Sequence, residues 1–161
     1  MYAAAGGAGS VHSVDIAAPA IATAKANMAL NPEAAEGTTH KSTVGDAFEV
    51  MANLKAGGAT FDVVIIDPPS FATNAGERDG AIRAYRKLAD LAVALVSPGG
   101  YLLQASCSSR VTEDDLVSTV HAAVRSHGRE IADEQVFGHG IDHPIEFAQG
   151  RYLKAIGLEF K

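Results

Sequence analysis

The chain has 161 residues, of which 47% are hydrophobic and 20% charged, and its formal net charge is −6 at pH 7. These values are typical of a soluble globular domain that is large enough to bury a core. No apolar run approaches the roughly 18 residues needed to span a membrane, and the first residues lack the pattern of a secretory signal. The single cysteine, Cys107, excludes an internal disulfide framework and fits a reducing compartment, so we expect a cytoplasmic protein.

The acidic balance bears on nucleic-acid binding. Binding to a phosphate backbone draws on clustered Lys and Arg, so this domain is expected to be a poor general nucleic-acid binder on its own. Any affinity for RNA must come from a local basic patch or from a partner domain.

The first half of the chain alternates short β-rich runs with helical stretches. An apolar run at residues 11–16 predicts a strand, and helical spacing at 19–30 predicts a helix with a proline near its first turn. A short strand at 42–48 is expected to run into a loop and then a helix. The near-continuous apolar run at 61–67 is typical of a strand that is covered on both faces of a parallel sheet.

The second half continues this alternation. The expected elements are a helix at 83–96, a strand at 101–108, a helix at 112–127 and strands at 131–137 and 152–160. Pro98-Gly99-Gly100 is expected to close the first helix, and Thr112 to cap the second, with Asp115 in its acidic first turn. Strands that alternate with helices predict an α/β layered sheet, and the lack of repeats or linkers predicts one domain over 1–161.

Three acidic residues stand at or just after strand ends: Asp15, Asp46 and Asp67. In a doubly wound sheet, ligands bind outside the carboxyl ends of the strands. An acid after an early strand is suited to accept hydrogen bonds from the ribose hydroxyls of a nucleotide-like cofactor, and an acid in the next loop can accept one from an adenine amine. Each could instead be a helix N-cap or turn residue. Three acids at successive strand ends favour a ligand site.

The motif DPPSF, residues 67–71, follows the predicted buried strand. Pro68 and Pro69 fix the backbone and remove two N–H donors, which leaves carbonyls free to face a substrate. An acid beside rigid carbonyls is suited to hold the polar edge of a base, and Phe71 can stack on that base. The alternative interpretation is a stiff turn from strand to loop.

Cys107 lies in QASCSSR at the end of the following predicted strand. A lone cysteine can be a small buried hydrophobe. If it faces the same edge as Asp67, it can instead be a nucleophile, provided that its thiol ionises readily. Its position alone leaves both interpretations open.

The glycine cluster and the histidine cluster predict no phosphate-binding loop and no metal site. The glycines of residues 6–9 precede a strand, whereas a phosphate-binding glycine loop must follow one, so they indicate a turn that ends a helix. His139, Asp142 and His143 have no Cys or further His at ligand spacing, so no metal is predicted.

A small basic face is expected on the helix after DPPSF. It consists of Arg83, Arg86 and Lys87. A solvated helix face is the ordinary explanation, but these residues are also the best local patch for a phosphate.

Several segments in chain order together resemble one family. SVDIA, GDAF, FDVVIIDPPSFA, LVSPGGYLLQASCSSRV, DHP and GRYLKAIGLEFK resemble the class I methyltransferase domain of the large-subunit ribosomal RNA methyltransferases that make 5-methylcytosine. The likeness covers nearly the whole chain. It implies a Rossmann-like sheet that is mostly parallel with an antiparallel C-terminal strand, S-adenosylmethionine as cofactor and RNA, most simply ribosomal RNA, as substrate.

The resemblance also implies cofactor-binding roles at matching positions. Asp15, with its neighbour Ile16, would bind the cofactor through its ribose. Asp46 with Ala47 would bind the adenine, and Asp67 would line both cofactor and substrate.

Catalytic and substrate-binding roles follow in the same way. Cys107 would attack carbon 6 of a flipped cytosine, which makes carbon 5 nucleophilic enough to take the methyl group, and Phe71 would contact the base. The other main group of 5-methylcytosine RNA enzymes carries a second cysteine beside the motif-IV proline, and this cysteine helps to release the product. Here that position offers only Asp67, Pro68 and Pro69, so product release must work differently.

The chain departs from the family at its start. In the family, a central strand and a Gly-rich loop precede the helix whose last turn resembles MYAAAGGA, and an N-terminal RNA-binding domain is present. We therefore expect a partial, N-terminally truncated domain in which the first strand and the Gly-rich loop are missing. Two other hypotheses stay open: a base-nitrogen methyltransferase in which DPPSF holds the exocyclic amine and Cys107 is structural, and a non-catalytic remnant.

Overall fold

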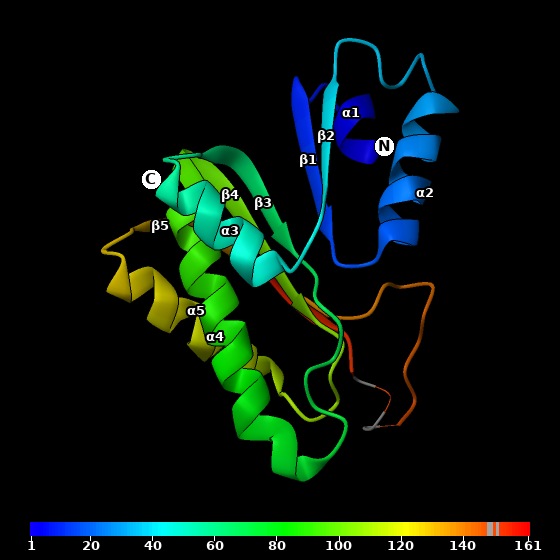
Figure 1. Ribbon diagram of the computed structural model, residues 1–161. Helices are drawn as coiled ribbons and strands as arrows, with labels where there is room; N and C mark the ends of the chain where they lie inside the picture. Colours follow the sequence, from blue (N-terminus) through cyan, green and yellow to red (C-terminus); the bar gives the residue numbers. More distant parts are fainter. Residues whose placement is uncertain (148–149, 151) are drawn as a thin grey trace. The chain divides into compact units, whose positions relative to one another are not determined.

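The computed structural model describes residues 1–147, 150 and 152–161. The chain forms two compact units, residues 1–53 and residues 54–161, and each is described by itself. Figure 1 shows the elements of both units. Arg151, which belongs to the tail that carries the family resemblance, lies outside the described residues.

The first unit is built on two short parallel strands. Its elements are α1 (Tyr2–Ala5), β1 (Ser10–Asp15), α2 (Ala18–Ala29), β2 (Thr39–Val44) and the start of α3 (Ala47–Ala56). The strands pair in register, with Asp15 opposite Val44 at their carboxyl ends. Side chains also join them, since His12 Nε2 and Thr43 Oγ1 share a hydrogen bond of 2.9 Å. Both strands therefore end at the same edge of this small sheet.

The second unit is a four-stranded sheet with two long helices. Its elements are β3 (Phe61–Ile66), a 3₁₀ turn (Ala75–Glu77), α4 (Arg78–Leu95), β4 (Val96–Ser106), α5 (Glu113–Ser126), β5 (Ile131–Phe137) and β6 (Lys154–Phe160). The strand order is β3-β4-β6-β5. The β3–β4 pair is parallel, whereas β6 runs antiparallel to both β4 and β5. The predicted α/β sheet with an antiparallel C-terminal strand is confirmed.

The core of the second unit lies between its helices and its sheet. Apolar residues recur along α4 and α5 at helical spacing, as expected of helices that bury one stripe against a sheet. The buried side chains include Leu88, Ala92, Val93, Leu116, Val120 and Val124 from the helices and Leu102, Ile156, Leu158 and Phe160 from the strands. Full burial of such an aliphatic or aromatic side chain stabilises a fold by about 1.5–3 kcal/mol. Among the described residues, no helix is long and apolar enough to cross a bilayer.

The structure corrects the expected start of β4. Pro98-Gly99-Gly100 was predicted to close the preceding helix, but the strand already begins at Val96, so these three residues lie inside it. A Cβ on Gly100 would lie 2.8 Å from the main-chain oxygen of Asp62, which no side chain tolerates. The glycine therefore serves a close approach of β3 and β4, where the register of the pair shifts.

Two further elements have a boundary that differs from the prediction by three residues or more. The segment 42–48 was expected to be a short strand that runs into a loop, but the strand begins three residues earlier and covers 39–44, and after the turn at Gly45 and Asp46 the chain already enters α3 at Ala47. The helix expected from residue 83 begins five residues earlier, at Arg78. The element types are as predicted in both places.

Candidate functional site

Asp67 and Cys107 follow two neighbouring parallel strands. In the β3–β4 register, Ile66 lies opposite Gln104, so Asp67 comes level with Ala105. Cys107 is two residues, about 7 Å, beyond that level and directly follows the last residue of β4. Because parallel strands end at the same edge of a sheet, the acid and the thiol lie at the carboxyl edge of the second unit, as the sequence predicts.

The residues on both sides of Cys107 are fixed by hydrogen bonds. The hydroxyl of Ser106 donates to the hydroxyl oxygen of Tyr85 at 2.9 Å, and the main-chain N–H of Ser108 donates to Ser106 Oγ at 3.3 Å. The Ser108 hydroxyl in turn donates to the carbonyl of Ala72 at 3.3 Å. Ser106 and Ser108 are buried, whereas Cys107 between them is half-buried. The main chain that carries the Cys107 thiol is therefore fixed by hydrogen bonds on both sides of it.

Tyr85 of α4 connects the thiol with DPPSF. Its side chain is fully buried. Burial raises the pKa of Tyr85, the hydrogen bond from Ser106 opposes this, and the negative charges of Cys107 and Asp67 raise the pKa further. Both groups therefore lie within electrostatic reach of one hydroxyl, which supports their placement at one site.

The DPPSF turn presents its residues in different ways. Asp67 and Pro69 are exposed, and Pro68 is half-buried. Ser70 Oγ donates to the carbonyl of Ala72 at 3.0 Å, which tightens the turn. Phe71 packs edge-on against the ring of Tyr85, with 5.1 Å between the ring centroids and an interplanar angle of 66°. Stacking of a base on Phe71 stays a prediction.

Lys154 is a residue of this site that sequence reasoning missed. It begins β6 and lies opposite Ser106 in the β4–β6 register. Its side chain is buried, and its Nζ donates to the carbonyls of Ser108 and Val111 at 2.5 Å each. Burial lowers the pKa of Lys154, and the negative charge of Cys107 acts in the opposite direction. A lysine at a predicted strand end is an ordinary surface residue, so no local pattern indicated its burial.

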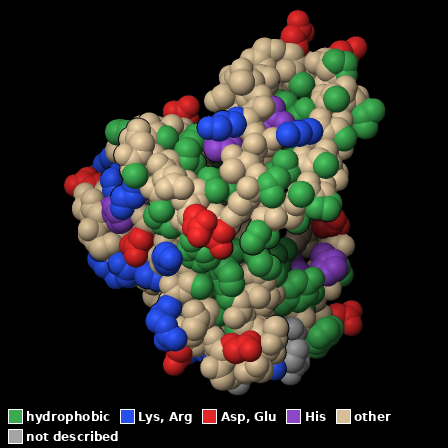
Figure 2. All heavy atoms as spheres, viewed as in Figure 1, with side chains coloured by type: hydrophobic (Ala, Val, Ile, Leu, Met, Phe, Trp, Pro, Cys, Tyr) green, Lys and Arg blue, Asp and Glu red, His purple; other side chains and the backbone are tan. Residues whose placement is uncertain are grey.

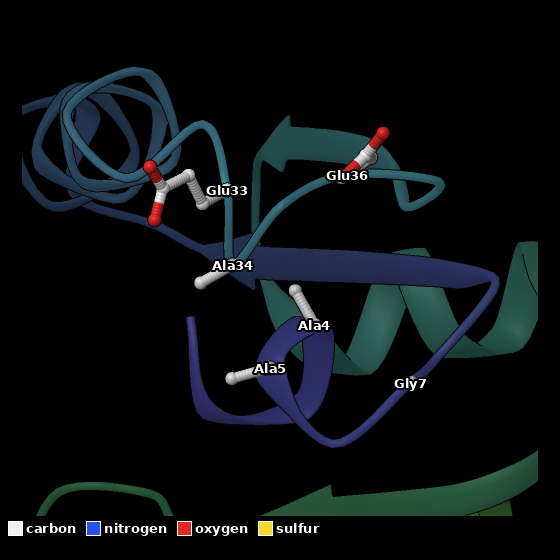
Figure 3. A pocket seen from close by; sticks show the side chains of 6 residues that line it. All are labelled: Ala4, Ala5, Gly7, Glu33, Ala34 and Glu36. Carbon is white, nitrogen blue, oxygen red and sulfur yellow. The ribbon is translucent and has the colours of Figure 1, made fainter.

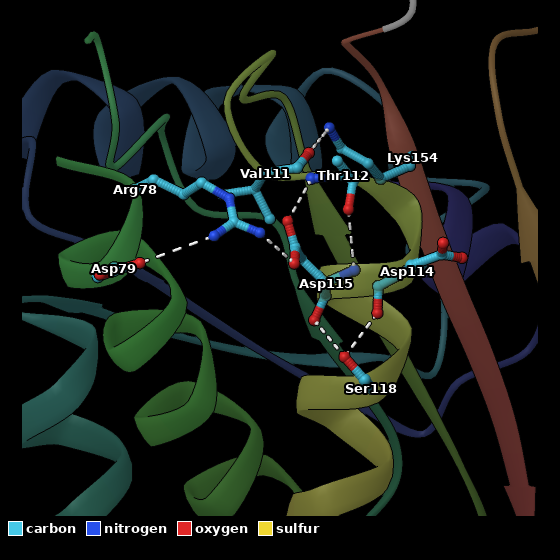
Figure 4. A network of polar contacts seen from close by, with 8 residues as sticks. All are labelled: Arg78, Asp79, Val111, Thr112, Asp114, Asp115, Ser118 and Lys154. Atoms are coloured by element: carbon cyan, nitrogen blue, oxygen red, sulfur yellow. Dashed lines mark hydrogen bonds and ion pairs between the residues drawn. The ribbon is translucent and has the colours of Figure 1, made fainter. Parts of the chain in front are cut away.

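The turn after Cys107 leads into a capped helix (Figure 4). Thr112 Oγ1 accepts the N–H of Asp115 at 3.1 Å, and the Asp115 carboxylate accepts the N–H of Thr112 at 2.9 Å. This reciprocal capping box confirms the predicted start of the helix. Arg78 of α4 donates to the same carboxylate at 2.6 Å, which ties α4 to the first turn of α5.

The two predicted cofactor acids lie together in the first unit. Asp15 ends β1, and the N–H of Gly45 donates to the Asp15 carbonyl at 3.0 Å, so the Asp46 turn lies beside it. Asp15 Oδ1 accepts the N–H of Ala17 at 2.7 Å. Asp46 Oδ1 accepts the N–H of Phe48 at 2.7 Å, at the start of α3. Each acid thus has the turn or cap role that was the alternative, and its second carboxylate oxygen remains a possible acceptor for a ligand.

Ile16 and Ala47 follow these two acids in the sequence. Ile16 is 72% exposed, which leaves it open to contact with a ligand. Ala47 is the first residue of α3. Their proposed contacts with a cofactor stay predictions.

A separate hollow in the first unit contains none of the predicted cofactor residues. It has a volume of about 560 Å³ and lies between α1 and the turn before β2. Figure 3 shows its lining residues, which are Ala4, Ala5, Gly7, Glu33, Ala34 and Glu36. Gly6 ends α1, and Gly7 follows with a φ of +89°, as expected of a turn that ends a helix.

The basic face of α4 borders a shallow groove. Figure 2 shows Lys and Arg side chains gathered over α4 and α5. The groove, of about 350 Å³, is lined by Ile82, Arg83, Arg86, Ser118, Thr119 and Ala122. Arg86 donates to the Asp90 carboxylate at 3.0 Å, so part of its charge is already balanced. Phosphate binding at this face stays a prediction.

The histidine cluster does not assemble a metal site in the described part of the chain, where no group of three or more potential ligands occurs. The His139 and His143 rings are stacked with 5.6 Å between their centroids. The edge of the His139 ring also meets Tyr152, at 4.9 Å.

Two curated relatives match nearly the whole chain, although no protein-family model does. A ribosomal RNA large subunit methyltransferase of Deinococcus radiodurans is 45% identical over 159 residues, which cover 99% of this chain and 38% of the relative. The ribosomal RNA large subunit methyltransferase I of Shewanella frigidimarina is 36% identical over 158 residues, which cover 97% of this chain and 39% of the relative. The chain thus spans less than half of the length of the curated relatives it matches.

Solved structures share the fold at lower identity. SMU.776, described as a methyltransferase complexed with SAH, has a TM-score of 0.74 and 22% identity, over 92% of this chain and 38% of that chain. The SAM-dependent methyltransferase from Agrobacterium tumefaciens has a TM-score of 0.65 and 19% identity, over 92% of this chain and 48% of that chain. The chain therefore has the Rossmann-like α/β fold of the class I methyltransferases.

Proposed function

We propose that this chain is part of an S-adenosylmethionine-dependent methyltransferase that acts on large-subunit ribosomal RNA, at carbon 5 of a cytosine. The names of the two relatives support the RNA substrate. The SAH complex of a structural neighbour supports the cofactor. The observation that carries the choice of carbon 5 is the shared edge of Asp67 and Cys107, both within electrostatic reach of the Tyr85 hydroxyl.

The hydrogen-bond acceptors of the first unit fit the cofactor. Asp15, with Ile16 beside it, would accept hydrogen bonds from ribose hydroxyls, because one carboxylate oxygen remains after the bond to Ala17. Asp46, with Ala47, would accept one from the adenine amine in the same way. When bound, S-adenosylmethionine supplies an electrophilic methyl group on a sulfonium.

Cys107 carries the proposed chemistry. Its thiolate forms a bond to carbon 6 of the cytosine, and the electron pair of the 5,6 double bond moves to carbon 5, which takes the methyl group. Loss of the carbon 5 proton to a base then restores the double bond as the bond between sulfur and carbon 6 breaks. Asp67, beside the rigid carbonyls of the DPPSF turn, would hold the polar edge of the base, with Pro68, Pro69 and Phe71 lining it.

The net charge limits how the domain meets RNA. With a formal charge of −6, it offers little to a phosphate backbone beyond the face of Arg83, Arg86 and Lys87. We therefore propose that RNA affinity comes largely from a partner segment or partner chain.

Methyl transfer to unmodified large-subunit rRNA made in vitro tests the proposal. With labelled S-adenosylmethionine, we expect 5-methylcytidine after digestion to nucleosides, and a covalent adduct with RNA that contains 5-fluorocytidine, because fluorine blocks loss of the carbon 5 substituent. Cys107→Ala should abolish both, whereas Ser109→Ala, at an exposed neighbour, should abolish neither. Transfer that survives in Cys107→Ala with the label on a base nitrogen would instead establish the base-nitrogen alternative.

A further inference from the structure

The second unit buries a cation directly beside its candidate nucleophile. Lys154 is 4% exposed, although its side chain carries an ammonium group. Its cross-strand partner is Ser106, the residue before Cys107. Lysine is almost never fully buried without partners, because removing an ammonium from water is costly. The position therefore calls for an explanation in terms of what the charge does.

The partners of the ammonium all belong to one turn. Nζ donates to the carbonyls of Ser108 and Val111, and Figure 4 shows the side chain reaching from β6 to this turn. The turn joins Cys107 to the first residues of α5. Lys154 therefore fixes the main chain that follows the thiol, whereas the Ser106–Tyr85 hydrogen bond fixes the residue that precedes it.

The ammonium also acts on the thiol through its charge. Burial is the main influence that lowers the pKa of Lys154, while the negative charges of Cys107, Asp115 and Glu113 raise it. The bond of Nζ to the carbonyl of Ser108, the residue after Cys107, holds this positive charge next to the thiol, and a nearby positive charge favours the thiolate form of a cysteine. The two carbonyl oxygens that accept hydrogen bonds from the ammonium carry no full charge, so they offset its positive charge less than a carboxylate at the same distance would.

We propose that Lys154 is a positioning residue for methyl transfer: it clamps the 108–111 turn and supplies the charge that favours the thiolate of Cys107. The inference rests on the proposed role of Cys107 as nucleophile. It deepens that role, because a thiolate and not a thiol forms the bond to carbon 6.

Alkylation by iodoacetamide tests the proposal without cofactor or RNA. Cys107 is the single cysteine of the chain, so the rate of mass increase reports on this thiol alone. At pH 7 we expect Lys154→Met to slow alkylation of the folded chain about tenfold, the change expected for loss of one nearby opposite charge. Lys154→Arg should restore most of the rate. Lys161→Met, which removes an exposed lysine just beyond the other end of β6, should leave the rate unchanged.

A second measurement needs no variant. The rate of Cys107 alkylation in the folded chain is divided by the rate in the guanidinium-unfolded chain, at pH values from 6 to 9. Since accessibility does not depend on pH, a favoured thiolate makes this ratio rise as the pH falls. Besides the thiol itself, the titratable groups that act on Lys154 are Asp115 and Glu113. Asp67 acts on Tyr85, the hydrogen-bond partner of Ser106. Their variants Asp67→Asn and Glu113→Gln should raise the ratio, because each removes a negative charge.

Three outcomes would overturn the proposal. They are a folded Lys154→Met that reacts as fast as wild type, one that reacts faster because the turn has loosened, and a wild-type ratio that is constant with pH. Each is independent of methyl transfer. If Cys107→Ala kept its activity, the function proposed above would fail while the alkylation result on Lys154 would still stand.

Discussion

Ser106 donates a hydrogen bond to the hydroxyl oxygen of Tyr85, at 2.9 Å, and so ties β4 to α4 directly before the candidate nucleophile. Both residues are completely buried. The pair is therefore a polar contact inside an apolar core, placed where the position of one thiol depends on it.

Tyr85→Phe should destabilise the chain by about 1–3 kcal/mol, because the buried Ser106 hydroxyl loses its acceptor. Urea unfolding followed by circular dichroism measures the change. Tyr2→Phe, at a side chain that is 96% exposed, is the matched control and should change stability little. Equal stability of both variants would mean that the buried hydrogen bond contributes nothing.

The same tyrosine should make stability sensitive to alkaline pH. Burial raises the pKa of Tyr85 above that of the unfolded chain, so the folded state holds this proton more tightly. The stabilisation is fully present below about pH 10 and is lost as the pH rises through the higher pKa of the folded chain. Wild type should thus lose stability between pH 9 and 11.5 more steeply than Tyr85→Phe. Parallel pH profiles of the two proteins would contradict this.

Asp115 should stabilise the folded chain at neutral pH, and this stabilisation should be lost in acid. Burial raises its pKa, but the hydrogen bonds from Thr112 and Arg78 outweigh this, so that the pKa lies below its ordinary value. The charged form stabilises the fold above about pH 4, and this is lost as the pH falls through the lowered pKa. At pH 7, Asp115→Asn should cost about 1 kcal/mol, since the 43% exposed Arg78 is partly screened by solvent.

The control for this change lies one residue away. Asp114→Asn alters an exposed carboxylate of the same helical turn. It should leave the midpoint of urea unfolding nearly unchanged at pH 7. The difference between Asp115→Asn and wild type should shrink as the pH falls below about 4 and through the lowered pKa of Asp115, and a difference that stays constant over this range would assign the effect to packing instead of charge.

Gly100→Ala should disrupt the junction of β3 and β4. Its Cβ would lie 2.8 Å from both the Asp62 carbonyl oxygen and a methyl group of Val96, so the strands must move apart. We expect a loss of about 1–3 kcal/mol, in the range of overpacked core sites. Gly138→Ala, where a Cβ meets nothing within 4 Å, is the control. A crystal structure of a fully stable Gly100→Ala with unmoved strands would refute the prediction.

Asp15→Asn should weaken binding of S-adenosylmethionine about tenfold or more, because an amide accepts hydrogen bonds from ribose hydroxyls less strongly than a carboxylate. The variant keeps an oxygen for the N–H of Ala17, so the turn itself should survive. Calorimetry measures the affinity, with Asp133→Asn on β5 as the control. Unchanged affinity in Asp15→Asn would remove this residue from the proposed cofactor site.

Local patterns predicted much of this fold. The strand at 131–137 has the predicted bounds, and Thr112 caps α5 as its sequence indicates, because alternation and capping are properties of neighbouring residues. The prediction for Pro98-Gly99-Gly100 was wrong because it, too, used neighbouring residues alone. A proline followed by two glycines usually ends a helix, and only the approach of β3 gives Gly100 its different role.

The candidate site was predicted in part. The order of strands placed Asp67 and Cys107 at one edge, since parallel neighbours end together. Lys154 escaped prediction because its burial depends on the antiparallel register between β4 and β6, which joins residues almost fifty positions apart. Neither the length of β6 nor its composition encodes which strand it will pair with.

The place of β6 in its sheet also sets an order of events during synthesis. Of the four strands of its sheet, β6 is synthesised last, yet it lies between β4 and β5 and is the only partner of β5 among the described strands. Until residues 154–160 have left the ribosome, β5 has nothing to pair with and the turn behind Cys107 lacks its ammonium clamp. A nascent chain without β6 would thus carry a thiol that lacks this support, and the thiol would reach its native surroundings only when β6 inserts.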